Sequence, residues 1–161
     1  MPTMTSHSPG TFCWVELAST DAEAAKKFYP ELFGWTIREV PITGGVYTMC
    51  QLDGHEVAAI YPISDAEKGQ GMPSHWFNYI AVTSADETAA HVVALGGTVL
   101  VAPFDVMEHG RMAVLQDPTG GMFGVWQAKN HCGVGVPSAM KTVYSPSGVS
   151  IELRSHPMSL P

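Results

Sequence analysis

Residues 12–62 and 76–126 of this chain repeat one pattern, and this repeat limits the possible folds more than any other feature. Each copy begins with a short apolar stretch and continues through an amphipathic stretch that ends at a glycine. The copies are 62 residues apart, both from Gly34 to Gly96 (96 minus 34) and from Trp14 to Trp76 (76 minus 14). A repeat of this length is a supersecondary unit that cannot bury its apolar face alone, so we expect the two copies to pair. Paired open sheets leave a cleft between them, and we expect the functional site there.

The first copy is predicted to contain one strand, one helix and three further strands. Residues 12–17 alternate and are rich in aromatic and β-branched side chains, which is typical of a strand. Thr20 and Glu23 have the spacing of a capping box, and Gly34 favours the left-handed conformation that ends a helix. Further strands are predicted at residues 35–40, 46–52 and 57–62, with turns at Gly44-Gly45 and Asp53-Gly54.

The second copy begins at Trp76 and repeats this order. Ser84 and Glu87 have the spacing of a second capping box. Strands are predicted at about residues 98–101, 111–116 and 122–127, and the Asp-Pro-Thr-Gly sequence at 117–120 favours a turn between the last two. We therefore expect paired βαβββ modules in residues 1–127, with module one at 9–63, a polar linker at 64–74 and module two at 75–127. The tail, residues 128–161, is rich in glycine and proline and is expected to be irregular or to wrap over the body.

Charge and composition exclude several classes of protein. The formal net charge is −7, from 8 Lys and Arg against 15 Asp and Glu, without a basic run. This argues against a nucleic-acid partner, which needs clustered cations. No apolar stretch is long enough to cross a bilayer, and the N-terminus lacks the pattern of a signal peptide, so we expect no membrane association. The three cysteines, Cys13, Cys50 and Cys132, form no Cys-x-x-Cys pair, which favours a reducing cytoplasm.

The tandem pattern resembles the vicinal oxygen chelate superfamily, which includes glyoxalase I, bleomycin-resistance proteins, fosfomycin-resistance enzymes and extradiol dioxygenases. The resemblance depends on Phe28-Tyr29 in the predicted helix, on Leu32-Phe33-Gly34-Trp35 after it, and on residues 117–126, which are similar to the family's closing turn and last strand. It covers about residues 9–127 and is greatest for the glyoxalase/bleomycin-resistance-like branch. It implies an α+β fold in which the two modules form a curved, mixed eight-stranded sheet around one cavity.

In the enzymes of this superfamily the cavity holds a divalent metal, bound by His, Gln or Glu on the first and last strands of each module. Carried over by position, these sites fall on Trp14, Ala58 and Gly124, and on Trp76 or Asn78. An indole, Ala and Gly offer no ligand atom, and an Asn amide is a weak one. We therefore expect the usual metal site to be missing and no cofactor to be bound. The alternative is a divalent metal at a nonstandard site, with candidate ligands Glu16, Glu56, His55, His75 and His109.

The predicted ligand site consists of the side chains that point into the cavity when the strands are aligned with those of the family. Aligning the tryptophans or the capping boxes gives offsets of 62 or 64, an even difference, so the same strand face is expected to point inward in both. The predicted lining is Trp14, Tyr47, Met49, Gln51, Trp76, Asn78, Arg111, Met112, Met122 and Trp126. Aromatic and methionine side chains with a few polar groups are the usual lining of a small-molecule pocket. The alternative is that this surface is simply core.

Glu16 is the predicted catalytic residue, since it lies two positions from Trp14 and so on the same strand face. A carboxyl group in a dry core needs a partner, and burial among indoles would raise its pKa into a range useful to a general acid or base. The alternative is a solvated carboxylate, or one paired with Arg111. In the tail, residues 145–153 also resemble the family's turn and last strand, with Glu152 at a ligand position, either by chance or as a further carboxylate.

Two main classes of function follow from these observations. In the first, the chain binds a small aromatic or amphipathic molecule in a Trp- and Met-lined cavity without a metal. In the second, it is a lyase or isomerase of the superfamily that uses Glu16 or a nonstandard metal site. A third, purely structural role would leave the cleft filled. A homodimer is possible, since the superfamily also builds its cavity across two chains.

Overall fold

The computed structural model describes residues 4–135, 143–144 and 150–151 of the chain. The first module consists of β1 (Phe12–Ser19), α1 (Ala22–Phe33), β2 (Thr36–Ile42), β3 (Gly45–Leu52) and β4 (His55–Pro62). A short helix, α2 (Asp65–Gly69), follows in the linker. The second module consists of β5 (His75–Ala81), α3 (Ala85–Ala94), β6 (Thr98–Val106), β7 (Gly110–Gln116) and β8 (Met122–Ala128). Both modules therefore have the predicted βαβββ order.

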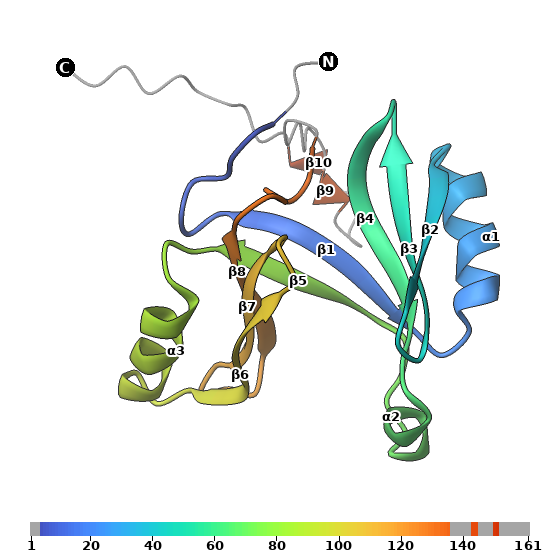
Figure 1. The fold of residues 1–161 in the computed structure, drawn as a ribbon. Helices are drawn as coiled ribbons and strands as arrows, with labels where there is room; N and C mark the ends of the chain where they lie inside the picture. The colour runs from blue at the N-terminus through green and yellow to red at the C-terminus, as the bar shows by residue number, and fades with distance from the viewer. Residues whose placement is uncertain (1–3, 136–142, 145–149, 152–161) are drawn as a thin grey trace.

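The eight strands of the two modules form one mixed sheet in the order β2-β3-β4-β1-β5-β8-β7-β6. The modules meet at its centre, where β1 and β5 pair antiparallel, whereas β1 with β4 and β5 with β8 pair parallel. Figure 1 shows the halves side by side, with α1 and α3 at the outer sides. This arrangement confirms the predicted α+β fold and eight-stranded mixed sheet.

Each half has an apolar cluster between its helix and its strands. The cluster under α1 consists of Leu17, Ala25, Cys50, Ala58 and Ile60. The cluster under α3 consists of Ala85, Ala89, Ala113, Leu115 and Val125. The helix residues in both are alanines, whose small side chains let the helices approach the sheet closely. We call the opposite face of the sheet, away from α1 and α3, the inner face.

The predicted turns form as expected, whereas the linker contains more structure than predicted. Asp53 has a φ of 51° and Gly54 one of 79° in the β3–β4 turn, a conformation that favours this pair of residues. In the β7–β8 turn, Asp117 Oδ1 accepts hydrogen bonds from the backbone N–H groups of Thr119 and Gly121. The linker holds α2 because Ser64 and the glutamate three residues later form a capping box.

Residues 129–135 leave β8 and return across one end of the inner face. The N–H of Val134 donates to the carbonyl of Cys13 (2.7 Å), and that of Gly135 donates to the carbonyl of Glu56 (2.8 Å). Further along the tail, β9 (Val143–Tyr144) and β10 (Ser150–Ile151) pair antiparallel. The candidate carboxylate Glu152 lies outside the described residues. In the described part of the chain, no helix has the length and apolar character needed to span a membrane.

Candidate functional site

The inner face joins the two halves through one cluster of side chains, composed of Cys13, Trp14, Met49, Ala59, Phe77, Tyr79, Ala81 and Trp126. Its two tryptophans are nearly buried, with Trp14 7% and Trp126 9% exposed, whereas Ile60 and Leu115 under the helices are 0% exposed. The two indoles therefore keep only a small contact with solvent.

Glu16 lies in the middle of β1 and its carboxylate is held by two tyrosines. The Tyr79 hydroxyl on β5 donates to Glu16 Oε1 at 2.6 Å, and the Tyr47 hydroxyl on β3 donates to Oε2 at 2.7 Å. Trp14 Nε1 in turn donates to the Tyr47 oxygen at 3.2 Å. Because Tyr47 and Tyr79 belong to different modules, this network forms only when the two modules pair.

Burial controls the protonation of this network. Burial raises the pKa of Glu16 above that of an ordinary glutamate, although the hydrogen bonds from Tyr79 and Tyr47 act in the opposite direction. Burial, reinforced by the negative charge of Glu16, also raises the pKa of both tyrosines far above its usual range. The tyrosines therefore remain neutral hydrogen-bond donors. Glu16 is a buried carboxyl group that favours a proton, or a hydrogen-bond donor on a ligand.

Glu16→Gln is expected to be more stable than the native protein at neutral pH, with the advantage disappearing in acid. Because the folded-state pKa of Glu16 is raised, the folded protein binds more protons than the unfolded chain between the ordinary glutamate pKa and the raised value. Native stability therefore decreases as the pH rises through this window, while the Gln amide does not titrate. Urea unfolding of both proteins between about pH 3.5 and 8 measures the difference.

The matched control for this titration is Glu39→Gln, which removes the same charge from an exposed carboxylate that pairs with Lys26. Its stability difference from the native protein is not expected to share the pH profile of Glu16→Gln. A Glu16→Gln difference that is constant across the pH range would contradict the burial of the Glu16 charge.

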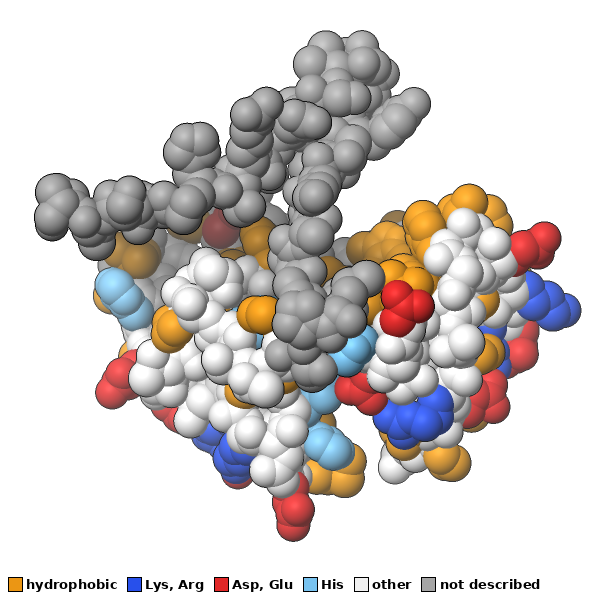
Figure 2. Space-filling model, turned by 90° about the horizontal axis from the view of Figure 1, so that it is seen from above, with side chains coloured by type: hydrophobic (Ala, Val, Ile, Leu, Met, Phe, Trp, Pro, Cys, Tyr) orange, Lys and Arg blue, Asp and Glu red, His pale blue; other side chains and the backbone are white. Residues whose placement is uncertain are grey.

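A second polar group lies at the end of the inner face that residues 129–135 cross. Glu56 accepts a hydrogen bond from Arg38 at 2.8 Å and pairs with His131 Nε2 at 3.0 Å. The His131 ring stands edge-on to the Trp14 ring, with centroids 4.9 Å apart. The backbone carbonyl of His131 accepts a hydrogen bond from Trp126 Nε1 at 2.8 Å. Burial lowers the pKa of His131, against the opposing effect of Glu56. In Figure 2, histidine and acidic side chains gather where the two halves of the molecule face each other.

The donors around Glu16 do not fit the divalent metal that the family resemblance implies. The strand neighbours of Glu16 are Ala59 on β4 and Phe77 on β5, and the β8 partner of Tyr79 is Gly124. None of these three side chains has a ligand atom, and neutral phenols are poor ligands for a divalent cation. Across residues 4–135 and the four described tail residues, no group of three His, Cys, Asp or Glu side chains is placed to hold a metal ion.

The structure brings together most of the predicted site residues. Those that lie on or against the inner face are Trp14, Glu16, Tyr47, Met49, Met112 and Trp126. Gln51 lies at the edge of this face, where it pairs with Glu56 across the β3–β4 ladder. All of them come from strands whose alternation places every second residue on one face. Their contact with a ligand remains a prediction.

Two predicted lining residues, Trp76 and Asn78, lie on the wrong face. Trp76 pairs with Leu17 and contacts Tyr29 of α1, with ring centroids 5.2 Å apart, and Asn78 pairs with Val15. Both therefore share the helix-bearing face. The residues of β5 that share the inner face with Glu16 are Phe77 and Tyr79.

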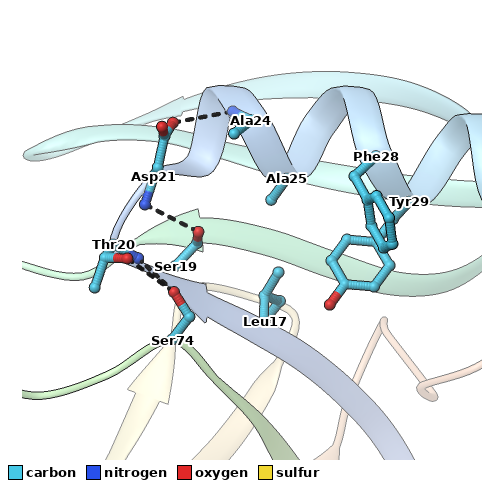
Figure 3. A pocket seen from close by; sticks show the side chains of 9 residues that line it. All are labelled: Leu17, Ser19, Thr20, Asp21, Ala24, Ala25, Phe28, Tyr29 and Ser74. Atoms are coloured by element: carbon cyan, nitrogen blue, oxygen red, sulfur yellow. Dashed lines mark hydrogen bonds between the residues drawn. The ribbon is translucent and has the colours of Figure 1, made fainter.

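The register error arises from the start of α1, which Figure 3 shows together with a cavity of about 250 Å³. Asp21, not Thr20, caps the helix by accepting from the N–H of Ala24 at 3.0 Å, because the Thr20 hydroxyl is bonded to that of Ser74 at 3.0 Å. The cap of α3 is Ser84, as predicted. The two caps are therefore 63 residues apart (84 minus 21), whereas the prediction used 62 or 64. Because successive strand residues point to opposite faces, this odd offset places Trp76 and Asn78 on the face opposite to the predicted one.

Two further predicted residues lie away from Glu16. Arg111 faces α3, where Nε and Nη2 donate to the two carboxylate oxygens of Asp86 at 2.7 and 2.8 Å, so the suggested pair between Arg111 and Glu16 is wrong. Met122, at the start of β8, lines a separate cavity of about 480 Å³ near the linker. The sequence-based prediction missed Tyr79, although the correct offset of 63 makes it the counterpart of Glu16 (16 plus 63).

Comparisons with known proteins agree with this architecture. Residues 11–125 match the model of the "Glyoxalase/Bleomycin resistance protein/Dioxygenase superfamily". The chain is 45% identical over 135 residues to the "Putative glyoxylase CFP32" of Mycobacterium tuberculosis, covering 83% of this chain and 51% of that protein. It is 39% identical over 135 residues to the "Anthracycline biosynthesis protein DauV" of Streptomyces sp. (strain C5), covering 77% of this chain and 49% of that protein. The chain thus spans about half the length of these relatives.

Solved structures share the fold at low sequence identity. The methylmalonyl-CoA epimerase of Mycobacterium tuberculosis is 14% identical with a TM-score of 0.57, covering 78% of this chain and 91% of that one. The Mn(II)-bound glyoxalase of Novosphingobium aromaticivorans is 19% identical with a TM-score of 0.53, covering 76% of this chain and 41% of that one. At these identities the likeness extends to the fold alone.

Proposed function

Because this chain belongs to the glyoxalase/bleomycin resistance protein/dioxygenase superfamily, we propose that its inner face binds a small aromatic or amphipathic molecule without the superfamily's usual metal. The observation that carries the proposal is the Glu16 carboxyl group, held by two tyrosine hydroxyls on the sheet face that also carries Trp14 and Met49. Burying an acid among aromatic side chains costs free energy, which a purely structural core would have no reason to accept. A ligand that donates a hydrogen bond to it accounts for its presence.

The chemistry of the walls suggests what such a ligand would be. Each Glu16 oxygen accepts one tyrosine hydroxyl, and a carboxylate oxygen has lone pairs for two acceptor contacts. A ligand hydroxyl or ammonium group could therefore bind Glu16 while its apolar part lies against Trp14 and Trp126. The name of the anthracycline biosynthesis relative points in the same direction, since anthracyclines are polycyclic aromatic molecules.

An anthracycline is the probe for this proposal, and Glu16→Gln is expected to bind it about 10- to 100-fold more weakly than the native protein does. The expected loss corresponds to a hydrogen bond to a charged group, about 1.5–3 kcal/mol. Isothermal titration calorimetry with the full chain measures the affinities. Glu39→Gln, the exposed carboxylate, is the control and is expected to bind as the native protein does.

A second experiment tests whether ligand binding requires a divalent metal. Protein purified without a chelator or an affinity tag is expected to contain a divalent metal well below one ion per chain by elemental analysis, and to bind the probe equally in EDTA. Stoichiometric zinc, nickel, iron or manganese together with binding lost in EDTA would overturn the metal-independent proposal. Equal affinities of Glu16→Gln and the native protein would overturn the role of Glu16.

The alternative function is a lyase or isomerase in which Glu16 moves a proton. The specific observation in its favour is that burial raises the pKa of Glu16 above that of an ordinary glutamate, which is the direction that favours a general acid. In that case Glu16→Gln would still bind substrate but would lose turnover, whereas a pure binding protein would show no turnover at all. A cytoplasmic location and a homodimer remain predictions, and sedimentation of the full chain tests the second.

A further inference from the structure

A second cavity opens where β5 and β8 separate, at the end of the sheet nearest the linker. The β5–β8 ladder includes only Tyr79 to Ala81 of β5, so it does not extend to residues 75–77 at the start of that strand. In Figure 1 this start of β5 runs away from β8 toward α2. The resulting cavity of about 480 Å³ is lined by Gln70, Gly71, Met72, Pro73, His75, Trp76, Phe77 and Met122. Its volume is within the range of small-molecule sites.

The walls of this cavity are aromatic rings and thioethers. Successive strand residues point to opposite faces, so Trp76 and Phe77 can line one cavity only at an open strand end such as this. Trp76 is 37% and Met122 is 49% exposed, so both leave apolar surface open to solvent in the same cavity. A flat aromatic molecule would cover both and would gain contacts with ring faces and sulfur atoms.

His75 gives the cavity a hydrogen-bond acceptor. Its Nδ1 lies 2.9 Å from the carbonyl oxygen of Pro73, and since a carbonyl can only accept, Nδ1 carries the proton. In the neutral ring Nε2 then has a lone pair, and this atom can accept a hydrogen bond from a ligand hydroxyl. The ordinary phenol group combines such a donor with a flat ring.

From this geometry we propose that the cavity between the linker, β5 and β8 binds a phenolic aromatic molecule. The ring lies between Trp76, Phe77 and Met122, and the hydroxyl donates to Nε2 of His75. This site is separate from the Glu16 network, because neither Glu16 nor its two tyrosine partners line the cavity. The nearest link is Phe77, whose ring packs edge-on against Tyr79 with centroids 5.2 Å apart.

The test is calorimetric titration of the full chain with 2-naphthol and with 2-methoxynaphthalene, which has the same rings but no hydroxyl donor. The native protein is expected to bind one 2-naphthol and to prefer it about 3- to 10-fold, the effect of one neutral hydrogen bond. His75→Phe keeps an aromatic ring but removes the acceptor, so this preference is expected to disappear. Met122→Ala is expected to weaken both ligands about threefold, with the preference retained.

Two control variants make the result specific. Phe104→Ala removes an exposed ring from β6, outside the cavity, and is expected to leave both affinities unchanged. Glu16→Gln separates the two sites, because 2-naphthol bound in this cavity keeps its affinity in the variant, whereas 2-naphthol bound at the inner face loses it. Failure of the native protein to bind 2-naphthol saturably, or unchanged affinities in both His75→Phe and Met122→Ala, would overturn the proposal. Binding lost only in Glu16→Gln would overturn it too, by assigning 2-naphthol to the inner face.

Discussion

Gly124→Ala is expected to lower the free energy of unfolding by about 3 kcal/mol and to disturb the Glu16 network at the same time. A methyl group at this position would overlap the ring of Tyr79, its partner in the β5–β8 ladder. The strand cannot move aside, because Gly124 also pairs with Val114 of β7. The Tyr79 ring must therefore shift, and its hydrogen bond to Glu16 shifts with it. Urea denaturation measures the loss of stability, and titration with the anthracycline measures the accompanying loss of affinity.

The control for this prediction is Gly69→Ala at the end of α2. A Cβ there would meet no atom within 4 Å, so the free energy of unfolding should change by no more than about 0.5 kcal/mol. If Gly124→Ala were as stable as Gly69→Ala, Tyr79 would not lie over Gly124 in solution, and the inner face would need a different arrangement.

Trp126→Ala is expected to have the largest effect on stability, about 4 kcal/mol. Its ring is 9% exposed, belongs to the inner-face cluster and lies over Gly110, where a Cβ would overlap it. The indole N–H also donates to the carbonyl of His131, so removing the side chain loosens the chain at His131, while Val134 and Gly135 stay bonded to the carbonyls of Cys13 and Glu56. Hydrogen exchange should therefore show faster exchange of the His131 N–H, which donates to the carbonyl of His109 in the native protein.

Trp76→Ala is the matched control, since it removes the same side chain from a site that is 37% exposed. It is expected to cost only about 1 kcal/mol, because less apolar surface is uncovered, and to leave the exchange of residues 129–135 unchanged. Equal losses for the two tryptophans would mean that Trp126 does not hold the segment that crosses the inner face.

Much of the fold follows from local signals in the sequence. The 62-residue repeat predicts two equal modules, the Asp53-Gly54 and 117–120 turns fix two hairpins, and strand alternation identifies the elements. The turns and the strand alternation depend on neighbouring residues, and the repeat is visible in the sequence itself, so none of these signals requires knowledge of which strands pair. The linker helix α2 was missed because its five residues are too few to show a helical period, although Ser64 and Glu67 had the spacing of a cap.

The candidate site is only partly predictable. Trp14 and Glu16 share a face because they are two residues apart on one strand, and the same rule places Tyr47 with Met49. The sequence also predicts that the ligand positions implied by the family resemblance carry no suitable donor. It could not identify Tyr79, because the offset between the modules decides which residues of β5 share the inner face with Glu16. The true offset is 63 and not 62 or 64, and the sequence cannot choose it because both Thr20 and Asp21 are acceptable helix caps.

The amino-acid sequence alone is enough to predict the two-module architecture, the turns and the face of β1 that carries Glu16. The convergence of Tyr47 and Tyr79 on that carboxylate, the pairing of Arg111 with Asp86 and the path of residues 129–135 across the end of the face are visible only in the folded molecule. The physical reason is that strand alternation is a property of one segment, whereas the register between two segments is fixed by a few contacts made after they meet. A shift of one residue in that register exchanges every side chain between the two faces of the sheet.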